Sequence, residues 1–331
     1  MAVMLVSCFL IFSCAFLLSL IFINVLKKIS IRNQLFISKG ISLVGGMGMG
    51  LSFMLVALAA LMLSRSLSRE TAGIIVCSLS MLVFGIMDDR RELSIRAKFL
   101  LQLIATCLLI LSGVRTKIVY IGIPLNILIT LIWVIGITNA FNHLDVMDGA
   151  AGGCAFLISG TLFIIGVLGQ DMGSAVLSLS LAGAAFGFLL CNFPPAKVYM
   201  GNSGSHFLGF VLASIALIIS YAPMERKIAL LSPLLILGLP IFDTTFLILA
   251  RSIKKNLPFK KSNDHLVLKF LFLVRSKRKA LGYLLVLCLL FCLCGLLVSQ
   301  VSNFFGGLVV IGIVLISLKI ALKMLKVSAD V

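Results

Sequence analysis

Charged residues are scarce in this chain. Only 12% of its 331 residues are Asp, Glu, Lys or Arg, whereas 61% are hydrophobic. A soluble globular domain carries about 25% charged residues, so the composition excludes an ordinary soluble domain. Apolar runs long enough to cross a bilayer as helices recur along the whole chain. We therefore predict an all-α, polytopic integral membrane protein.

Eleven apolar runs are candidate transmembrane helices, and we assign them to a single transmembrane domain over residues 1–331. The first run has no good small-residue cleavage pattern and leads into a basic loop, so we interpret it as a retained helix rather than a signal peptide. The predicted spans are residues 3–26, 41–63, 72–87, 97–114, 120–138, 150–169, 173–191, 206–222, 228–250, 282–299 and 304–325.

Acidic residues are also few, and the formal net charge is +17. The distribution of this charge argues against a nucleic-acid partner. With eleven helices, one side of the membrane receives 22 of the 28 Lys and Arg, and the other side receives six. The positive-inside rule places the N-terminus outside and the C-terminus in the cytoplasm. The basic side suits membrane lipids with anionic head groups and phosphorylated ligands.

Metal-type cysteine spacing is missing. The nine cysteines include no C-x-x-C pair, and most fall inside the predicted helices. We interpret them as small apolar packing residues.

The most polar stretch is residues 139–149, between two apolar runs. It holds two amides and two carboxylates: Asn139, Asn142, Asp145 and Asp148. Carboxylates are costly to desolvate unless a cation, a proton or a partner compensates them. A solvated loop is the simpler reading. The presence of other polar clusters on the same side favours a functional site.

A second polar cluster, Asp88 and Asp89, ends the third predicted span, and Lys98 begins the next helix. Adjacent carboxylates repel each other, so such a pair can hold Mg²⁺ or take a proton. The alternative is a helix-end charge cluster that Arg90 and Arg91 neutralise.

Two glycine-containing segments also allow both a functional and a structural interpretation. Gly201 and Gly204 lie just before the eighth span, where free N–H groups can meet an anion; a simple helix cap is the alternative. The paired glycines Gly45 and Gly46 favour close helix packing over approach of a ligand. We also expect a small strand pair in the external segment of residues 115–124.

The last polar features lie near the C-terminal third. Asp243 lies deep in the ninth span, where an acid indicates a site or a structural helix–helix hydrogen bond. The loop over residues 251–279 is the most basic. The simpler interpretation is a solvated or lipid-facing loop, and the alternative is that a few of its cations bind phosphate.

Four of these clusters fall on the predicted cytoplasmic side, and the opposite segments hold no comparable cluster. The four are residues 88–89, 139–148, 201–206 and 251–265. A transporter would place its ionisable groups near the midplane of the membrane. Few polar residues besides Asp243 lie there, which disfavours that alternative. The pattern favours a site where a soluble phosphorylated donor meets a lipid acceptor.

These motifs resemble those of the polyprenyl-phosphate N-acetylhexosamine-1-phosphate transferases, the family that contains MraY and WecA. Residues 88–102 resemble its aspartate-pair motif, residues 139–149 its N-x-x-N-x-x-D-x-x-D-G motif, and residues 195–205 the segment around its G-D-x-G motif. Residues 240–244 and the eleven-helix count are more similar to the WecA branch.

The resemblance implies transfer of N-acetylhexosamine-1-phosphate from a UDP-amino sugar to undecaprenyl phosphate, with release of UMP at the cytoplasmic face of the cell membrane. It implies Mg²⁺, with Mn²⁺ as the alternative metal, and leaves a homodimer open. The implied catalytic residues are Asp88, Asp89, Asp145 and Asp148. The implied substrate-binding residues are Lys98, Asn139, Asn142, Gly201, Ser203, Gly204, Arg251 and His265. The implied metal ligands are Asn202 and Asp145.

Three departures from the family pattern stand out. Asn202 replaces the Asp of G-D-x-G, and an amide offers Mg²⁺ an oxygen but no charge. Residues 262–268 keep only the first His and the Leu of the D-R-x-H-L-H-H motif, and Ser42 replaces a Pro. The alternative function is therefore a catalytically degenerate member with a binding or regulatory role in the membrane.

Overall fold

The backbone of this chain forms helices because lipid offers no hydrogen-bond partner to exposed backbone groups. The computed structural model describes residues 2–222, 225–253 and 264–327. The α-helices of these residues are α1 (Ala2–Asn33), α2 (Gly45–Leu63), α3 (Arg69–Arg90), α4 (Ile95–Leu111), α5 (Ile123–Leu144), α6 (Ala150–Leu168), α7 (Met172–Asn192), α8 (Gly201–Ile218), α9 (Ser232–Ile236), α10 (Gly238–Ile253), α11 (Leu266–Val274), α12 (Lys277–Gln300) and α13 (Asn303–Leu325). The 3-10 helix η1 (Lys227–Leu231) precedes α9.

The prediction of an all-α, polytopic membrane protein is confirmed. Among the described residues, nine helices are long and apolar enough to cross a membrane, and a bent pair makes ten if it counts as one span. Reaching the predicted eleven would require α4, which has only 17 residues. The exact number of spans therefore stays a prediction.

The bent pair corrects the predicted continuous span over residues 228–250. Lys227–Ile236 and Gly238–Ile253 meet at an angle of 71°. Pro240 explains the break, because its ring would clash with the carbonyl of Ile236 if one helix continued through both residues, and it has no N–H to donate. The acidic residue Asp243 therefore lies on a separate helix, α10, just beyond the break.

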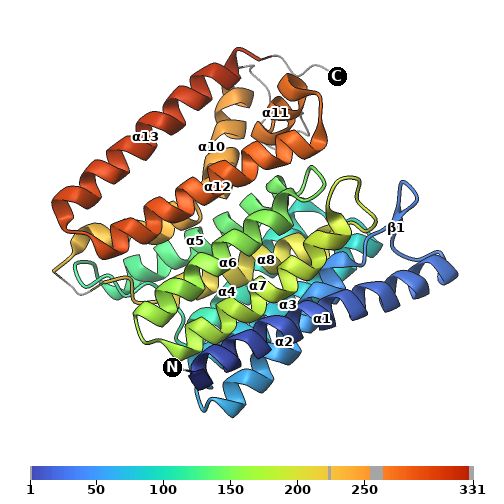
Figure 1. The fold of residues 1–331 in the computed structure, drawn as a ribbon, viewed down its shortest axis with the longest axis horizontal. Helices are drawn as coiled ribbons and strands as arrows, with labels where there is room; N and C mark the ends of the chain where they lie inside the picture. Colours follow the sequence, from blue (N-terminus) through green and yellow to red (C-terminus); the bar gives the residue numbers. More distant parts are fainter. Residues whose placement is uncertain (1, 223–224, 254–263, 328–331) are drawn as a thin grey trace.

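Helix α8 occupies the centre of the bundle. Every residue from 203 to 216 is buried, and α8 packs against α2, α3 and α5. Helix α12 packs against α6, α9 and α13, so the C-terminal helices lie along one side of the bundle, at the top of Figure 1. The N-terminus of α8 is thus surrounded by other helices.

Two local predictions need correction. Asn139 and Asn142 lie on the last turns of α5 rather than in a loop. The segment that we expected to contain a strand pair is held instead by Asn126, whose Nδ2 donates to the carbonyls of Ile118 and Ile121 at 3.1 Å. The strand pair of the described residues is β1 (Ile37–Ser38) with β2 (Ile41–Ser42), which are antiparallel.

The basic loop also contains a helix that we did not predict, α11 (Leu266–Val274). Asp243 accepts a hydrogen bond from the backbone N–H of Leu266 at 2.7 Å, which satisfies a donor in the first turn of α11. Residues 254–263, including Ser262 and Asn263 of the motif comparison, lie outside the described residues.

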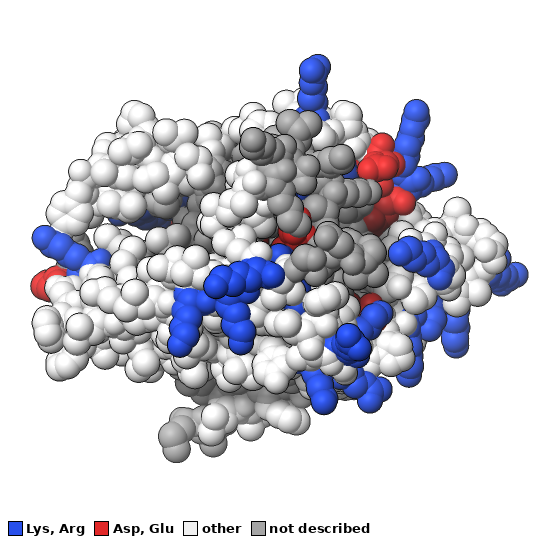
Figure 2. All heavy atoms as spheres, turned by 90° about the horizontal axis from the view of Figure 1, so that it is seen from above, with Lys and Arg blue, Asp and Glu red and all other residues white. Residues whose placement is uncertain are grey.

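The two ends of the bundle differ in charge. Figure 2 shows most blue side chains in the right half of the view, the side on which β1 lies in Figure 1, with one group near the centre and a small group at the left edge. Hydrogen bonds join segments of the same end, as between Asn142 and Asn202 at one end and between Arg226 and Ser299 at the other. The predicted alternation of segments between two ends therefore holds for these contacts.

Candidate active site

Three helices meet through polar side chains at one end of the bundle. Asp89 ends α3, Asn142 lies near the end of α5, and Asn202 begins α8. The Asn142 Nδ2 donates to Asn202 Oδ1 at 3.2 Å and to Ser205 Oγ at 2.9 Å. We call Asp89, Asn142, Asn202, Ser203 and Ser205 the polar junction.

Asp89 fixes the start of α8 within this junction. Its Oδ1 accepts from the backbone N–H of Asn202 at 2.6 Å, and its Oδ2 accepts from that of Ser203 at 3.0 Å. These N–H groups belong to the first turn of a helix, which has no intrahelical partners for its N–H groups and favours negative charge. Asp89, which we predicted to be catalytic, therefore joins α3 to α8.

Asp88 has a different environment from its neighbour. It is only 3% exposed, its Oδ1 accepts from the backbone N–H of Leu93 at 2.8 Å, and its Oδ2 lies 2.6 Å from Lys98 Nζ. The Lys98 side chain is 25% exposed. Asp88 thus holds a partly exposed ammonium group at the end of the bundle where the polar junction lies.

Asn139 pairs with a residue of α4. Its Nδ2 donates to Gln102 Oε1 at 2.8 Å and to the carbonyl of Ile135 at 2.8 Å. The buried Gln102 therefore orients the amide of Asn139. Gln102 is the last residue of the segment that resembles the aspartate-pair motif, and the sequence analysis assigned it no role.

Asp145 is the candidate residue whose carboxylate has no hydrogen bond or ion pair among the described residues. It follows the last residue of α5 and is half-buried. Burial, with the neighbouring charges of Asp89 and Asp148, raises the pKa of its carboxyl to about 7. This position has unbalanced negative charge and favours a proton or a cation.

Asp148 anchors a neighbouring segment instead. Its Oδ2 accepts from Lys277 Nζ at 3.1 Å and from the backbone N–H of Ala196 at 3.3 Å. Beside it, the N–H of Gly149 donates to Asn192 Oδ1 at 2.7 Å. These contacts hold the turn after α5 against α12 and the segment before α8. Lys277 and Asn192 were missed as positioning residues because their pairing joins distant segments.

The glycines at the starts of α2 and α8 allow their backbones to touch. A Cβ on Gly46 would collide with the backbone of Gly204, and a Cβ on Gly201, where φ is +73°, would lie 2.5 Å from Asp89 Oδ2. The interpretation of Gly45 and Gly46 as packing residues is confirmed. Gly201 is required both by its backbone conformation and by the closeness of Asp89.

The remaining predicted binding residues form a neighbouring cluster. His265 Nδ1 lies 3.2 Å from Asp243 Oδ2, and the His265 ring lies 6.3 Å from the ring of His143, which adjoins Asn142 on α5. Arg251, in the last turn of α10, is buried and interacts electrostatically with Asp264. The structure therefore places His265 near the end of α5, and Arg251 beside the start of α11.

His206 is a polar residue to which we had assigned no role. It is 2% exposed, and neither ring nitrogen has a hydrogen-bond partner among the described residues. Its ring lies 5.0 Å from that of Phe84, one helical turn before Asp88. Its position one turn after Asn202 is the sequence signal that points to it.

The oxygen atoms around the polar junction are too few to hold a divalent cation alone, so a bound substrate would have to supply further ligands. No three His, Cys, Asp or Glu side chains form a metal cluster in the part of the chain that the structure describes. Mg²⁺, however, is commonly held by one or two carboxylates together with substrate phosphates and water. The unpaired carboxylate of Asp145 and the nearby amide oxygens meet that requirement.

The fold and the polar junction define a general class, a polytopic membrane protein with a polar site at the ends of its helices. Comparison with known proteins narrows the class. Residues 71–220 match the model of glycosyl transferase family 4. The chain is 30% identical over 268 residues to the decaprenyl-phosphate N-acetylglucosaminephosphotransferase of Mycobacterium leprae, an alignment that covers 70% of this chain and 67% of that protein. The chain belongs to glycosyl transferase family 4.

Two further relatives carry similar names. A Bacillus subtilis protein named as a probable undecaprenyl-phosphate N-acetylglucosaminyl 1-phosphate transferase is 32% identical over 65% of this chain and 63% of its own length. The undecaprenyl-phosphate alpha-N-acetylglucosaminyl 1-phosphate transferase of Thermotoga maritima is 30% identical over 57% of each chain. The chain matches less than two thirds of the length of these two relatives.

Proposed function

We propose that this protein transfers N-acetylhexosamine-1-phosphate from a UDP-sugar to undecaprenyl phosphate and so starts a lipid-linked cell-envelope glycan. An oxygen of the lipid phosphate forms a bond to the sugar-linked phosphorus of the donor. The bond between that phosphorus and the bridging oxygen of the diphosphate breaks, and UMP leaves. The polar junction, which joins the ends of three membrane helices, is the observation that carries this proposal.

The residues of the junction differ in what they can do. Asp89 has both oxygens engaged by N–H groups of α8, so it positions the start of that helix. Asn142 and Asn202 hold each other through one amide contact and keep further amide atoms to bind and orient the donor. Asp88 keeps Lys98 in place, and the ammonium group of Lys98 binds a phosphate.

Asp145 and the amide oxygen of Asn202 would hold a divalent cation, for which we propose Mg²⁺. A bound cation would neutralise the negative charge that the diphosphate brings to the site. The raised pKa of Asp145 supports this role, because its charge has no partner among the described side chains. Phosphate oxygens of the donor would complete the coordination.

The proposed location is the cytoplasmic face of the cell membrane. The sequence places most cations on the side that carries the junction, and the positive-inside rule assigns that side to the cytoplasm. A UDP-sugar is water-soluble and needs a site open to that compartment. The lipid phosphate would reach the same site from the bilayer.

The direct test is UMP release by the purified protein in detergent, with UDP-N-acetylglucosamine, undecaprenyl phosphate and Mg²⁺. The proposal predicts UMP only when all three are present. Omission of the lipid separates transfer from simple hydrolysis of the donor. Absence of UMP across a panel of UDP-sugars, with a folded protein, would contradict the proposal.

One observation favours the second candidate, a degenerate member that binds but does not transfer. Val267 takes the place of a family His, and it is fully buried in the hydrophobic core. Val267 therefore offers no polar contact to a phosphate. Tight binding of a UDP-sugar without UMP release would support this second function.

A further inference from the structure

A cavity lies at the end of the bundle opposite the polar junction. It has a volume of about 380 Å³ and is lined by the segment before α5, the end of α8 and the residues around η1. Helix α8 has 18 residues and is therefore about 27 Å long. The cavity is thus separated from the junction by roughly the thickness of a hydrocarbon core.

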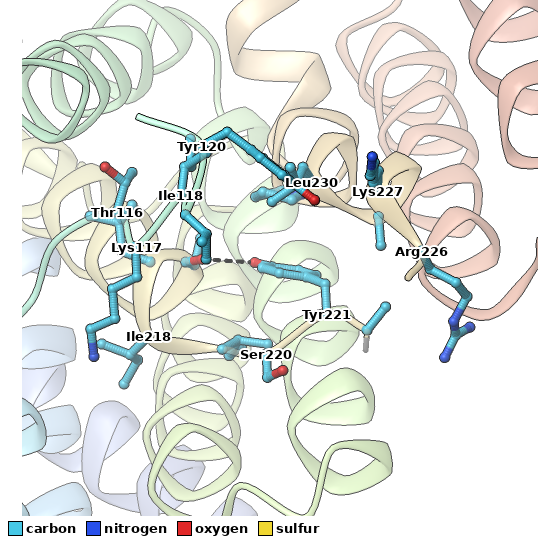
Figure 3. Close-up of a pocket in the computed structure, with 17 residues that line it drawn as sticks. Thr116, Lys117, Ile118, Tyr120, Ile218, Ser220, Tyr221, Arg226, Lys227 and Leu230 are labelled. Atoms are coloured by element: carbon cyan, nitrogen blue, oxygen red, sulfur yellow. Dashed lines mark hydrogen bonds between the residues drawn. The ribbon is translucent and has the colours of Figure 1, made fainter. Parts of the chain in front are cut away.

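Cations gather around this cavity although its end of the protein has few. Only six of the 28 Lys and Arg belong to that end by the loop alternation. Three of those six, Lys117, Arg226 and Lys227, line the cavity, and its lining includes no Asp or Glu of the described residues. Figure 3 shows Tyr120, Leu230 and Tyr221 bordering the space, with Lys227 at its edge beside Tyr120, whereas the side chains of Lys117 and Arg226 extend away from it. The rim of the cavity, rather than its interior, therefore attracts negative charge.

Two of these cations retain donors for a ligand. The Lys227 ammonium lies 5.3 Å from the centroid of the Tyr120 ring and has no ion pair with an acid among the described residues. Arg226 uses one nitrogen, Nη1, to donate to the carbonyl of Ser299 at 2.8 Å. Lys117 is already paired with Glu70 at 2.7 Å.

The rest of the cavity is apolar. Leu217, Ile218 and Leu230 contribute to its wall, and the Tyr221 hydroxyl donates to the carbonyl of Ala216 at 3.0 Å, which leaves the ring as the contact surface. Tyr120 and Leu230 are 64% and 52% exposed. A site with cations, apolar walls and exposed large side chains at the end of membrane helices suits an amphiphile with an anionic head.

We propose that this cavity binds the phosphate-bearing head group of an anionic phospholipid, with Lys227 and Arg226 on the phosphate and the apolar wall on the glycerol and upper acyl chain. The volume of the cavity is large enough for a lipid head group, since sites for small ligands span about 300–1,000 Å³. This site is separate from the polar junction and does not depend on the transfer reaction.

Native mass spectrometry of the full chain in detergent tests the proposal, with phosphatidylglycerol and phosphatidylcholine as probes. Lys227→Gln removes one cation from an exposed position, and Leu230→Trp fills the cavity without a change of charge. Arg65→Gln is the matched control, because Arg65 is an exposed cation assigned to the same end that does not line the cavity. Thermal unfolding confirms that each variant is folded.

The expected result is retention of phosphatidylglycerol over phosphatidylcholine by the wild type. Lys227→Gln should reduce that retention about fivefold, because one Lys near an anionic lipid contributes about 1 kcal/mol. Leu230→Trp should reduce it too, and Arg65→Gln should not. Equal retention by all four proteins would overturn the proposal. Retention of glycerol phosphate by the wild type, with no retention of phosphatidylglycerol, would overturn the proposal of a lipid and show that a free phosphate is the ligand.

Discussion

Asp89 and Asn202 lie 113 residues apart in the chain, yet the carboxylate of the first accepts a 2.6 Å hydrogen bond from the backbone N–H of the second. This contact joins the end of α3 to the start of α8. Asp89, one of the two aspartates of the family's motif, therefore positions α8 and fixes the backbone of Asn202. The geometry of the candidate active site depends on it.

Asp89→Asn should therefore destabilise the folded protein. An asparagine retains one acceptor oxygen, but its NH₂ group would face the second N–H, and the charge at the helix start is lost. A charged hydrogen bond contributes about 1.5–3 kcal/mol, so we expect a loss of that order. Thermal unfolding in detergent measures it, with the exposed Glu92→Gln as the control. An unchanged midpoint in Asp89→Asn would contradict this role.

The stability of the metal-free protein should depend on pH through Asp145. The pKa of its carboxyl is about 7 in the folded protein and about 3.9 in an unfolded chain. Between these values the folded state binds more protons, so stability falls as pH rises from about 4 to 7 and then levels off. Unfolding midpoints across this range should decline less in Asp145→Asn. The same decline in both proteins would exclude Asp145 as the source.

Asn202→Asp should strengthen metal binding. The substitution adds a charge next to Asn142, whose Nδ2 still has an oxygen to which it can donate. Affinity for hard cations rises with the number of charged ligands, so we expect the Mg²⁺ concentration for half-maximal activity to fall on the order of tenfold. A Mg²⁺ titration of UMP release measures this. An unchanged or weaker Mg²⁺ dependence would remove position 202 from the metal site.

Val267→His should not restore the family's histidine motif. Val267 is fully buried, so an imidazole there would lose hydration in an apolar core at a cost of about 1–3 kcal/mol. Leu268→His is the matched control, because position 268 is only half-buried. We expect a lower unfolding midpoint for the first variant than for the second. A stable and more active Val267→His protein would refute this account of α11.

The sequence predicted much of the fold because apolar length is a local property. The runs that became α6, α7 and α13 are continuous, and their predicted bounds lie within a few residues of the observed ones. The break near Pro240 and the short helix α11 were not predicted. Both depend on contacts made elsewhere, such as the hydrogen bond from Leu266 to Asp243.

The candidate site was predicted by residue type but not by role. Asp88, Asp89, Asp145 and Asp148 were assigned together, and their partners now separate them. Asp89 binds backbone N–H groups, Asp88 binds Lys98 and Asp148 binds Lys277. Spacing along the chain cannot distinguish these roles, because each partner comes from another segment.

Transfer of radiolabelled N-acetylglucosamine-1-phosphate to undecaprenyl phosphate tests the central claim most directly, in the wild type, Asp145→Asn and Asp171→Asn. The control makes the same change where Asp171 caps α7, and asparagine caps a helix about as well. We expect labelled lipid from the wild type and from Asp171→Asn. The rate of transfer by Asp145→Asn should be lower by about a hundredfold or more. Equal product from Asp145→Asn, or none from the wild type, would contradict the account.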